Sequence, residues 1–180
     1  MKKIVIVIIG FLMIVPSVFA NELNPRKGFF IGFSLGGGVL DATGIDADGA
    51  FLGSLRIGGG LNEKLLLMGE TSNAVISNNG VNTGLYSVNF SAQYFVMDTG
   101  LFVRPGVGLS YTNTESSSGN VTVITSNDEA GLSLIGATGY EFRLGRSFCL
   151  TPEFNYGFAR IDGVNFNRFG LSASFMFYFK

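Results

Sequence analysis

The stretch from Phe169 to Lys180 alternates apolar residues with small or polar ones. One set of alternate positions holds Phe169, Leu171, Ala173, Phe175, Phe177 and Phe179, and the other holds Gly170, Ser172, Ser174, Met176, Tyr178 and Lys180. A period of two predicts a β-strand with one apolar face and one mainly polar face. A tilted strand of about 9–11 residues can cross a bilayer. Because hydrocarbon does not tolerate unpaired backbone groups, such a strand predicts a closed barrel.

Seven upstream segments show similar alternation, which gives eight predicted strands. They cover residues 29–40, 50–61, 65–74, 86–97, 101–112, 131–142, 148–158 and 169–180. The connections are alternately short (62–64, 98–100, 143–146) and long and polar (41–49, 76–84, 113–130, 161–167). This sorting is typical of an up-and-down barrel with short periplasmic turns and longer outer loops. We therefore predict an all-β fold, an eight-stranded antiparallel up-and-down transmembrane β-barrel with both termini at the short-turn end.

Two features depart from regular strand sequence. Pro105 and Pro152 lie inside predicted strands, where each removes a ladder hydrogen bond, and we expect a local bulge at both. Glycine triplets at 36–38 and 58–60 are expected to face each other on the first two strands. There they would let the barrel wall bend or pack closely.

The N-terminus carries an export signal. Lys2 and Lys3 precede an apolar run from Ile4 to Val15, and Pro16 and a small-residue site ending at Ala20 follow it. The run is shorter than the roughly 18 apolar residues of a spanning helix, so a cleaved signal peptide over residues 1–20 is favoured over an anchor. Residues 21–180 then form one outer-membrane β-barrel domain.

Several segments carry a resemblance to a known family. They are RPGVG at 104–108, GYEFRL at 139–144, EFNYG at 153–157 and the terminal aromatic alternation of Phe175, Phe177 and Phe179. From Gly28 to Phe179 the chain resembles the small OmpA/OmpX-type outer-membrane β-barrel family. The pattern of Phe175, Phe177 and Phe179 also resembles the C-terminal assembly signal of such barrels, although Lys180 follows the terminal aromatic residue. The resemblance implies a place in a Gram-negative-type outer membrane, contact with its lipid and lipopolysaccharide, and insertion by the barrel assembly machinery.

Charged residues occur at inward positions of the predicted strands. They are Arg56, Glu70, Arg104, Glu141 and Glu153, with Arg168 a further candidate. A three-residue turn at 62–64 sets Arg56 directly opposite Glu70. Charges inside an eight-stranded barrel must be paired, and side chains fill an interior of that size. We therefore predict a lumen ion-pair network that plugs the barrel, similar to the interior network of the OmpA family. An acid–base pair made by Glu141 and Glu153 is the weaker alternative.

Other chemistry is poorly supported. The chain has no histidine, which excludes a Ser-His-Asp triad and a histidine metal site. Enzyme families known on comparable barrels use histidine in catalysis, so we expect neither an enzyme nor a cofactor. Cys149 is the single cysteine and is expected to be a small inward residue. Without Lys2 and Lys3, ten basic residues stand against thirteen acidic ones, a net of −3, which does not favour nucleic acid.

The predicted outer loops are acidic. Their carboxylates are Asp41, Asp46, Asp48, Glu115, Asp128, Glu129 and Asp162. A divalent cation held by Asp41, Asp46 and Asp48 against lipopolysaccharide phosphates is one interpretation. These residues lack the full calcium-loop pattern, so a solvated surface is favoured. Residues 113–130, rich in Ser, Thr and Asn, form the longest loop and the best candidate surface for a ligand.

Several functions remain open at this level. A non-enzymatic structural or surface-interaction protein ranks first. A narrow channel or porin-like pore, and an adhesin or immune-evasion protein, are the alternatives. A soluble barrel with an apolar ligand would need an apolar interior, whereas here the charges point inward and the phenylalanines outward.

Overall fold

The computed structural model describes residues 26–43, 45–78, 81–96, 99–118, 121–126 and 129–179. The predicted signal peptide, residues 1–20, and Lys180 lie outside the described residues. The strands are β1 (Gly28–Ala42), β2 (Ile45–Gly60), β3 (Leu65–Asn78), β4 (Val81–Phe95), β5 (Leu101–Ser118), β6 (Val121–Ser126), β7 (Gly131–Tyr140), β8 (Phe142–Arg143), β9 (Phe148–Ile161) and β10 (Val164–Phe179). No helix in the described part of the chain is long and apolar enough to cross a membrane.

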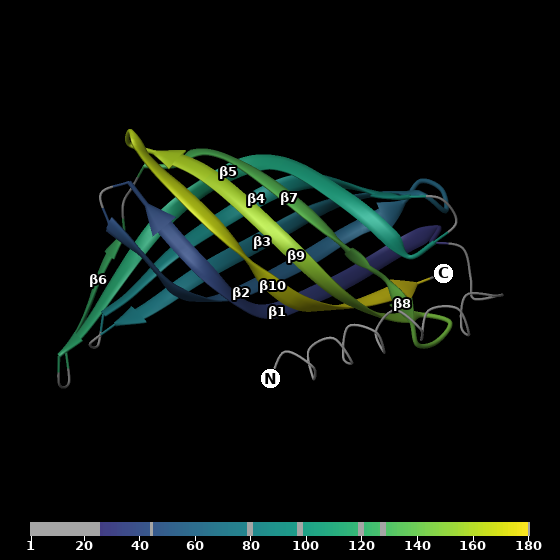
Figure 1. Cartoon of the computed structure of the whole chain (residues 1–180), viewed down its shortest axis with the longest axis horizontal. Coiled ribbons are helices and arrows are strands. Elements are labelled where there is room, and N and C mark those ends of the chain that lie inside the picture. Colours follow the sequence, from purple (N-terminus) through teal and green to yellow (C-terminus); the bar gives the residue numbers. More distant parts are fainter. Residues whose placement is uncertain are drawn as a thin grey trace, which may run out of the picture.

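The strands form one closed antiparallel barrel (Figure 1). The order around the wall is β10-β1-β2-β3-β4-β5-β7-β9, and β9 pairs with β10 to close it. Strand β8 follows β7 along β9, whereas β6 pairs with β5 alone. The wall therefore has eight strands, which confirms the predicted fold class. Phe29 lies opposite Phe179, so β1 begins and β10 ends at the same end. We call this the turn end and the opposite one the loop end.

A short turn fixes the register of β2 and β3. The Asn62 side-chain oxygen accepts hydrogen bonds from the backbone N–H groups of Lys64 (2.8 Å) and Leu65 (2.9 Å). Asparagine is favoured in turns because its side chain can take the place of a backbone acceptor. Across this turn, Arg56 lies directly opposite Glu70.

The predicted long loops are mostly strand, so that part of the sequence interpretation is wrong. Strand β3 extends to Asn78, β5 to Ser118 and β9 to Ile161, with their partners beginning three residues later. In Figure 1 the β5–β6 hairpin runs past the rest of the barrel. These extensions are rich in polar residues. The apolar residues of the predicted loops that pack inward, Ile76, Ile161 and Phe166, are too widely spaced to mark a strand by a period of two.

Neither proline produces the expected bulge. Ser91 pairs with Gly106 and Tyr94 with Val103, so the β4–β5 register is the same on both sides of Pro105. Pro152 sits opposite Ala173 without a register shift between β9 and β10. The pairing register does shift between β1 and β2, near Leu40. At the prolines, the wall omits individual ladder bonds and does not insert an extra residue.

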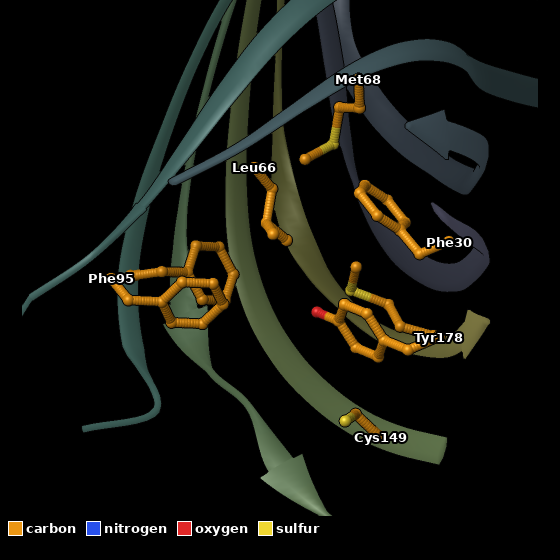
Figure 2. Close-up of a cluster of buried hydrophobic side chains, with 8 residues drawn as sticks. Phe30, Leu66, Met68, Phe95, Cys149 and Tyr178 are labelled. Atoms are coloured by element: carbon orange, nitrogen blue, oxygen red, sulfur yellow. The ribbon is translucent and has the colours of Figure 1, made fainter. Parts of the chain in front are cut away.

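Two groups of buried apolar side chains fill the interior, one toward each end. The turn-end cluster, shown in Figure 2, consists of Phe30, Leu66, Met68, Phe95, Phe102, Cys149, Met176 and Tyr178. The loop-end cluster consists of Leu40, Ala50, Leu52, Ala74, Leu85, Ala159 and Ile161. Outside the barrel, alternate positions expose large apolar side chains such as Phe90 and Leu134. The interior is therefore closed by packing at two levels.

The glycine triplets do not face each other as expected. Residues 36–38 pair with 50–52, and residues 58–60 pair with 28–30. Gly36 points inward against β10, where an added Cβ would lie 2.2 Å from the Leu171 carbonyl oxygen and 2.6 Å from the Ser172 Cβ. At the adjacent Gly37, an added Cβ would meet nothing within 4 Å. Close approach of β1 and β10 thus depends on Gly36.

This difference predicts that alanine substitutions at these two neighbouring glycines will change the stability of the barrel by different amounts. Gly36→Ala forces a methyl group against backbone and should lower the free energy of unfolding by about 1–3 kcal/mol, the usual cost of overpacking. Gly37→Ala should change it by less than about 0.5 kcal/mol, as surface substitutions do. Urea unfolding of both variants in detergent micelles measures the difference. Equal stabilities would contradict a tight β1–β10 contact at Gly36.

Candidate functional site

A polar layer separates the two apolar clusters. On β3, inward-facing Leu66 and Met68 belong to the turn-end cluster, Glu70 comes next, and Ala74 belongs to the loop-end cluster. Strand β5 likewise places Arg104 one inward position beyond Phe102. The buried charged residues in the middle of the barrel are Arg56, Glu70, Arg104, Glu153 and Arg168. The same period of two that exposes apolar residues outside thus brings these charges together inside.

Glu153, from β9, is the centre of this layer. Its two carboxylate oxygens accept hydrogen bonds from both terminal nitrogens of Arg56, at 2.5 and 3.2 Å. They also accept hydrogen bonds from both terminal nitrogens of Arg104, at 3.1 and 3.2 Å. Because a carboxylate and a guanidinium match in a two-pronged geometry, these are among the strongest side-chain pairs. One carboxylate therefore holds β2 and β5 to β9 across the lumen.

Glu70, from β3, completes the network. Arg56 Nε donates to Glu70 Oε1 at 3.1 Å, and Arg104 Nε lies 3.4 Å from Glu70 Oε2. Further neutral acceptors are the hydroxyl of Ser174, 2.7 Å from Arg56, and the side-chain oxygen of Gln93, 3.2 Å from Arg104. Two arginines and two glutamates thus form a closed set of four.

Serine and asparagine side chains occupy the remaining width of the lumen. The contacts among them are Ser34–Ser54 (2.7 Å), Ser87–Ser110 (2.6 Å), Ser133–Asn89 (2.8 Å) and Asn155–Ser172 (3.0 Å). The Ser172 hydroxyl also donates to Glu153 at 3.2 Å. Small hydroxyl residues bond across neighbouring strands and leave room for the long arginines. These hydroxyl and amide groups thus surround the charged network and fill most of the width of the polar layer.

Arg168 also lies in this layer but lacks a carboxylate of its own. It is 6% exposed, and its Nη2 donates to the Ser72 hydroxyl at 2.6 Å. No carboxylate of a described residue lies within 4.0 Å of its guanidinium. Sequence analysis named Arg168 only as a further candidate, because it precedes the predicted strand 169–180.

Glu141 is buried and ion-paired, but it lies apart from the four-residue network, in a second group of contacts at the turn end. It accepts hydrogen bonds from Arg26 Nε (2.9 Å), from Arg143 Nε (3.3 Å) and from the Tyr178 hydroxyl (2.7 Å). Glu153 lies opposite Gly139, so Glu141 is one inward position closer to the turn end. The alternation gives the direction of a side chain but not its height in the barrel.

Arg26 closes the turn end, and sequence analysis did not identify it as a site residue. Besides Glu141, it donates to the backbone oxygens of Glu63 and Thr99, both at 3.1 Å. Its guanidinium lies 3.5 Å from the centre of the Phe95 ring, which is a cation–π contact. Because Arg26 precedes the first strand, no periodic pattern marks it. It links the N-terminal segment to two short turns.

The interior offers no evident reaction centre. Cys149 is buried in the turn-end cluster beside Tyr178, as Figure 2 shows. Among the described residues, no group of three or more His, Cys, Asp or Glu side chains is placed to hold a metal. In the candidate cation loop, Asp48 accepts a hydrogen bond from the Gly49 N–H at 2.7 Å, and the side chain of Asp46 lies outside the description.

The terminal aromatic residues line the outer face where the barrel closes. Phe175 stacks on Phe33 with ring centres 5.0 Å apart, and Phe179 lies 5.8 Å from Phe29. Phe177 lies 5.0 Å from Phe148 on the other neighbouring strand. These contacts brace β10 between β1 and β9, and an assembly role for the three residues remains a prediction.

The four-residue network predicts a non-additive pair of substitutions. Glu153→Gln leaves Arg56 and Arg104 to share Glu70 and should cost about 3–5 kcal/mol of unfolding free energy. Adding Arg104→Gln restores the original balance of charge and should recover part of that loss. Unfolding in urea, with each variant in the same lipid vesicles, gives the coupling energy. A double variant that loses the sum of the two single losses would contradict the pairing.

Comparison with solved structures supports the fold. Neisserial surface protein A matches with a TM-score of 0.67 and 17% identity, covering 85% of this chain and 98% of that one. Ail, the attachment invasion locus protein of Yersinia pestis, matches with a TM-score of 0.58 and 15% identity, covering 84% of this chain and 99% of that one. The N-terminal β-barrel domain of Pseudomonas aeruginosa OprF matches with a TM-score of 0.52 and 14% identity, covering 84% of this chain and 100% of that one. No protein-family model and no curated protein matches the chain. The chain has the fold of the small eight-stranded outer-membrane β-barrels.

Proposed function

We propose that this protein is a non-enzymatic barrel of the outer membrane with a structural and surface-interaction role. The observation that carries the proposal is the inverted distribution of side chains, with paired charges inside and exposed apolar residues outside. Monomeric soluble proteins rarely expose a continuous apolar surface, whereas a barrel in lipid requires one. The exposed residues include Val88 and Phe90 on β4 and Leu132 and Leu134 on β7.

Tyrosines mark the two borders of this apolar band. Tyr86 and Tyr111 stack near the loop end with ring centres 5.4 Å apart, and Tyr94 is exposed near the turn end. The eight residue-to-residue steps from Tyr86 to Tyr94 correspond to about 27 Å of strand at ~3.4 Å per residue. With a tilt of about 40°, this strand spans ~20 Å, close to the ~25 Å band of outer-membrane barrels with its aromatic girdles.

A channel is the weaker candidate. The turn-end cluster, the polar layer and the loop-end cluster lie in series along the barrel axis. An eight-stranded barrel has an interior that side chains can fill, and here they do so at three levels. Opening a pore would separate Glu153 from Arg56 and Arg104, which leaves buried charges unpaired. We therefore assign the lumen a structural role.

Catalysis is likewise disfavoured. The chain contains no histidine, and its one cysteine is buried among aromatic and methionine side chains. The oxygens of the buried glutamates Glu70 and Glu153 are occupied by contacts with arginines. A general acid or base needs a free proton-transfer position near a substrate site, and these carboxylates lack one.

The surface role is assigned to the β5–β6 hairpin. Residues 113–118 pair with 121–126 beyond the barrel, within the 113–130 region that the sequence singled out. No described strand other than β5 pairs with β6, so its outer edge presents backbone groups for another extended segment. The six residues of β6 include no proline and no charged residue. An extended segment of a surface partner is the ligand that this edge favours.

The charge of the loop end indicates which partners fit. Asp41, Asp48, Glu129 and Asp162 lie at this end, against the exposed Arg160. One structure of Ail is a complex with the heparin analogue sucrose octasulfate, at a TM-score of 0.57 and 14% identity. A sulfated polyanion does not complement an acidic end. We therefore favour a neutral or basic protein partner for this chain.

The test uses epitope tags on intact Gram-negative cells. A tag inserted between residues 119 and 120, which connect β5 to β6 in the sequence, should be labelled by antibody on intact cells. A matched tag in the short turn at 62–64 should be labelled only after the outer membrane is permeabilised. Labelling of the short-turn tag alone on intact cells would contradict the proposed orientation. Labelling of neither tag on intact cells would contradict the proposed location in the outer membrane.

The surface role is tested separately by shortening the hairpin. Replacement of residues 115–126 by a short Gly-Ser turn leaves the barrel interior untouched, so the protein should still show the heat-shifted gel band of a folded barrel. Adherence of the producing cells to epithelial monolayers and their retention of serum proteins should fall to the level of cells without the protein. Unchanged retention and adherence would contradict the hairpin assignment while leaving the membrane barrel standing.

A further inference from the structure

The polar layer carries an excess of positive charge. It contains three guanidinium groups, Arg56, Arg104 and Arg168, and two carboxylates, Glu70 and Glu153, which leaves a net charge of +1. Arginine stays protonated in proteins, so the excess cannot be removed by loss of a proton. A buried charge without a counter-charge costs several kcal/mol. The interior therefore has a place for one negative charge that the described residues do not supply.

Of the three arginines in this layer, Arg168 is the one that makes no salt bridge with a described carboxylate. Glu153 is engaged with Arg56 and Arg104, and Glu70 bonds the same two arginines. Of the five N–H donors of Arg168, one is directed to the Ser72 hydroxyl, at 2.6 Å. The side chain is 94% buried, since 6% of its surface is exposed. Its remaining donors thus lack partners among the described side chains.

A small cavity lies beside this guanidinium. Its volume is about 20 Å³, and its lining includes Arg168, Arg56, Ser72, Asn155 and Ser172. Glu70 and Glu153 also contribute to the lining, but both are already bonded to arginines. A cavity needs roughly 10–15 Å³ to hold one water molecule, so this one accepts a single water or a single-atom ion. Sulfate, phosphate and carboxylate ligands are too large.

We propose that the barrel interior binds one halide ion, chloride under ordinary conditions, in the cavity beside Arg168. Arg168 supplies charge and N–H donors, and the Ser72 hydroxyl and the second N–H of the Asn155 amide supply neutral donors. A metal cation is disfavoured by the excess positive charge, and a water molecule would fill the space without neutralising it. The proposal is independent of the surface role of the hairpin.

Halide-dependent stability gives the first test. Binding to the folded state alone multiplies the ratio of folded to unfolded protein by 1 + [halide]/Kd, which is about 100-fold at 100 times Kd. The unfolding midpoint of the wild-type barrel in detergent micelles should therefore rise in sodium chloride or bromide relative to sodium gluconate at equal ionic strength. Equal ionic strength removes general screening from the comparison.

Two variants assign the effect to the cavity. Arg168→Gln should abolish the difference between halide and gluconate, whereas Arg160→Gln, at an exposed arginine on β9, should retain it. Crystals grown in sodium bromide supply a second measurement that needs no variant, because bromide scatters anomalously. An anomalous peak within hydrogen-bond distance of the Arg168 guanidinium is expected. Equal wild-type midpoints in halide and gluconate, or bromide crystals without that peak, would overturn the proposal, even if Arg168→Gln fails to fold.

Discussion

The need to pair charges inside a narrow barrel governs this structure. Glu153 accepts four hydrogen bonds from Arg56 and Arg104, and Glu70 contacts the same two arginines from the other side. These residues come from β2, β3, β5 and β9, so the network forms only when distant strands hold the correct register. A shift of one residue in any of them would turn a charge toward the outer apolar face. The network thus ties the closure of the barrel to a single arrangement of strands.

The apolar clusters and the hydroxyl pairs depend on the same arrangement. The turn-end and loop-end clusters exclude water on both sides of the charges, which strengthens every pair between them. Because the lumen is filled by its own side chains, we look for function at the two ends and on the outer wall. The turn end is held by Arg26 and Glu141, while the loop end carries the β5–β6 hairpin. Our proposed surface role follows from this division.

The alternation of residue types was sufficient to predict the eight strands and their inward faces. The short Asn62 turn also allowed the Arg56–Glu70 register to be counted. The same method failed in the predicted long loops, because their strand extensions are rich in polar residues and their few inward apolar residues do not alternate regularly. It also did not separate Glu141, at the turn end, from the charges around Glu153, since a period of two does not give the height of a side chain in a tilted barrel. Arg26 lies outside every strand, so its contacts to the turns became visible only in three dimensions.

The central claim is that side chains seal the barrel, and ion flow through the protein tests it most directly. Purified wild-type protein inserted into a planar lipid bilayer should give no steady conductance above that of the bare membrane. Glu153→Gln, which leaves two arginines to share one glutamate, should give brief openings if the network is the barrier. A large, stable and ion-selective conductance in the wild-type protein would contradict the sealed barrel.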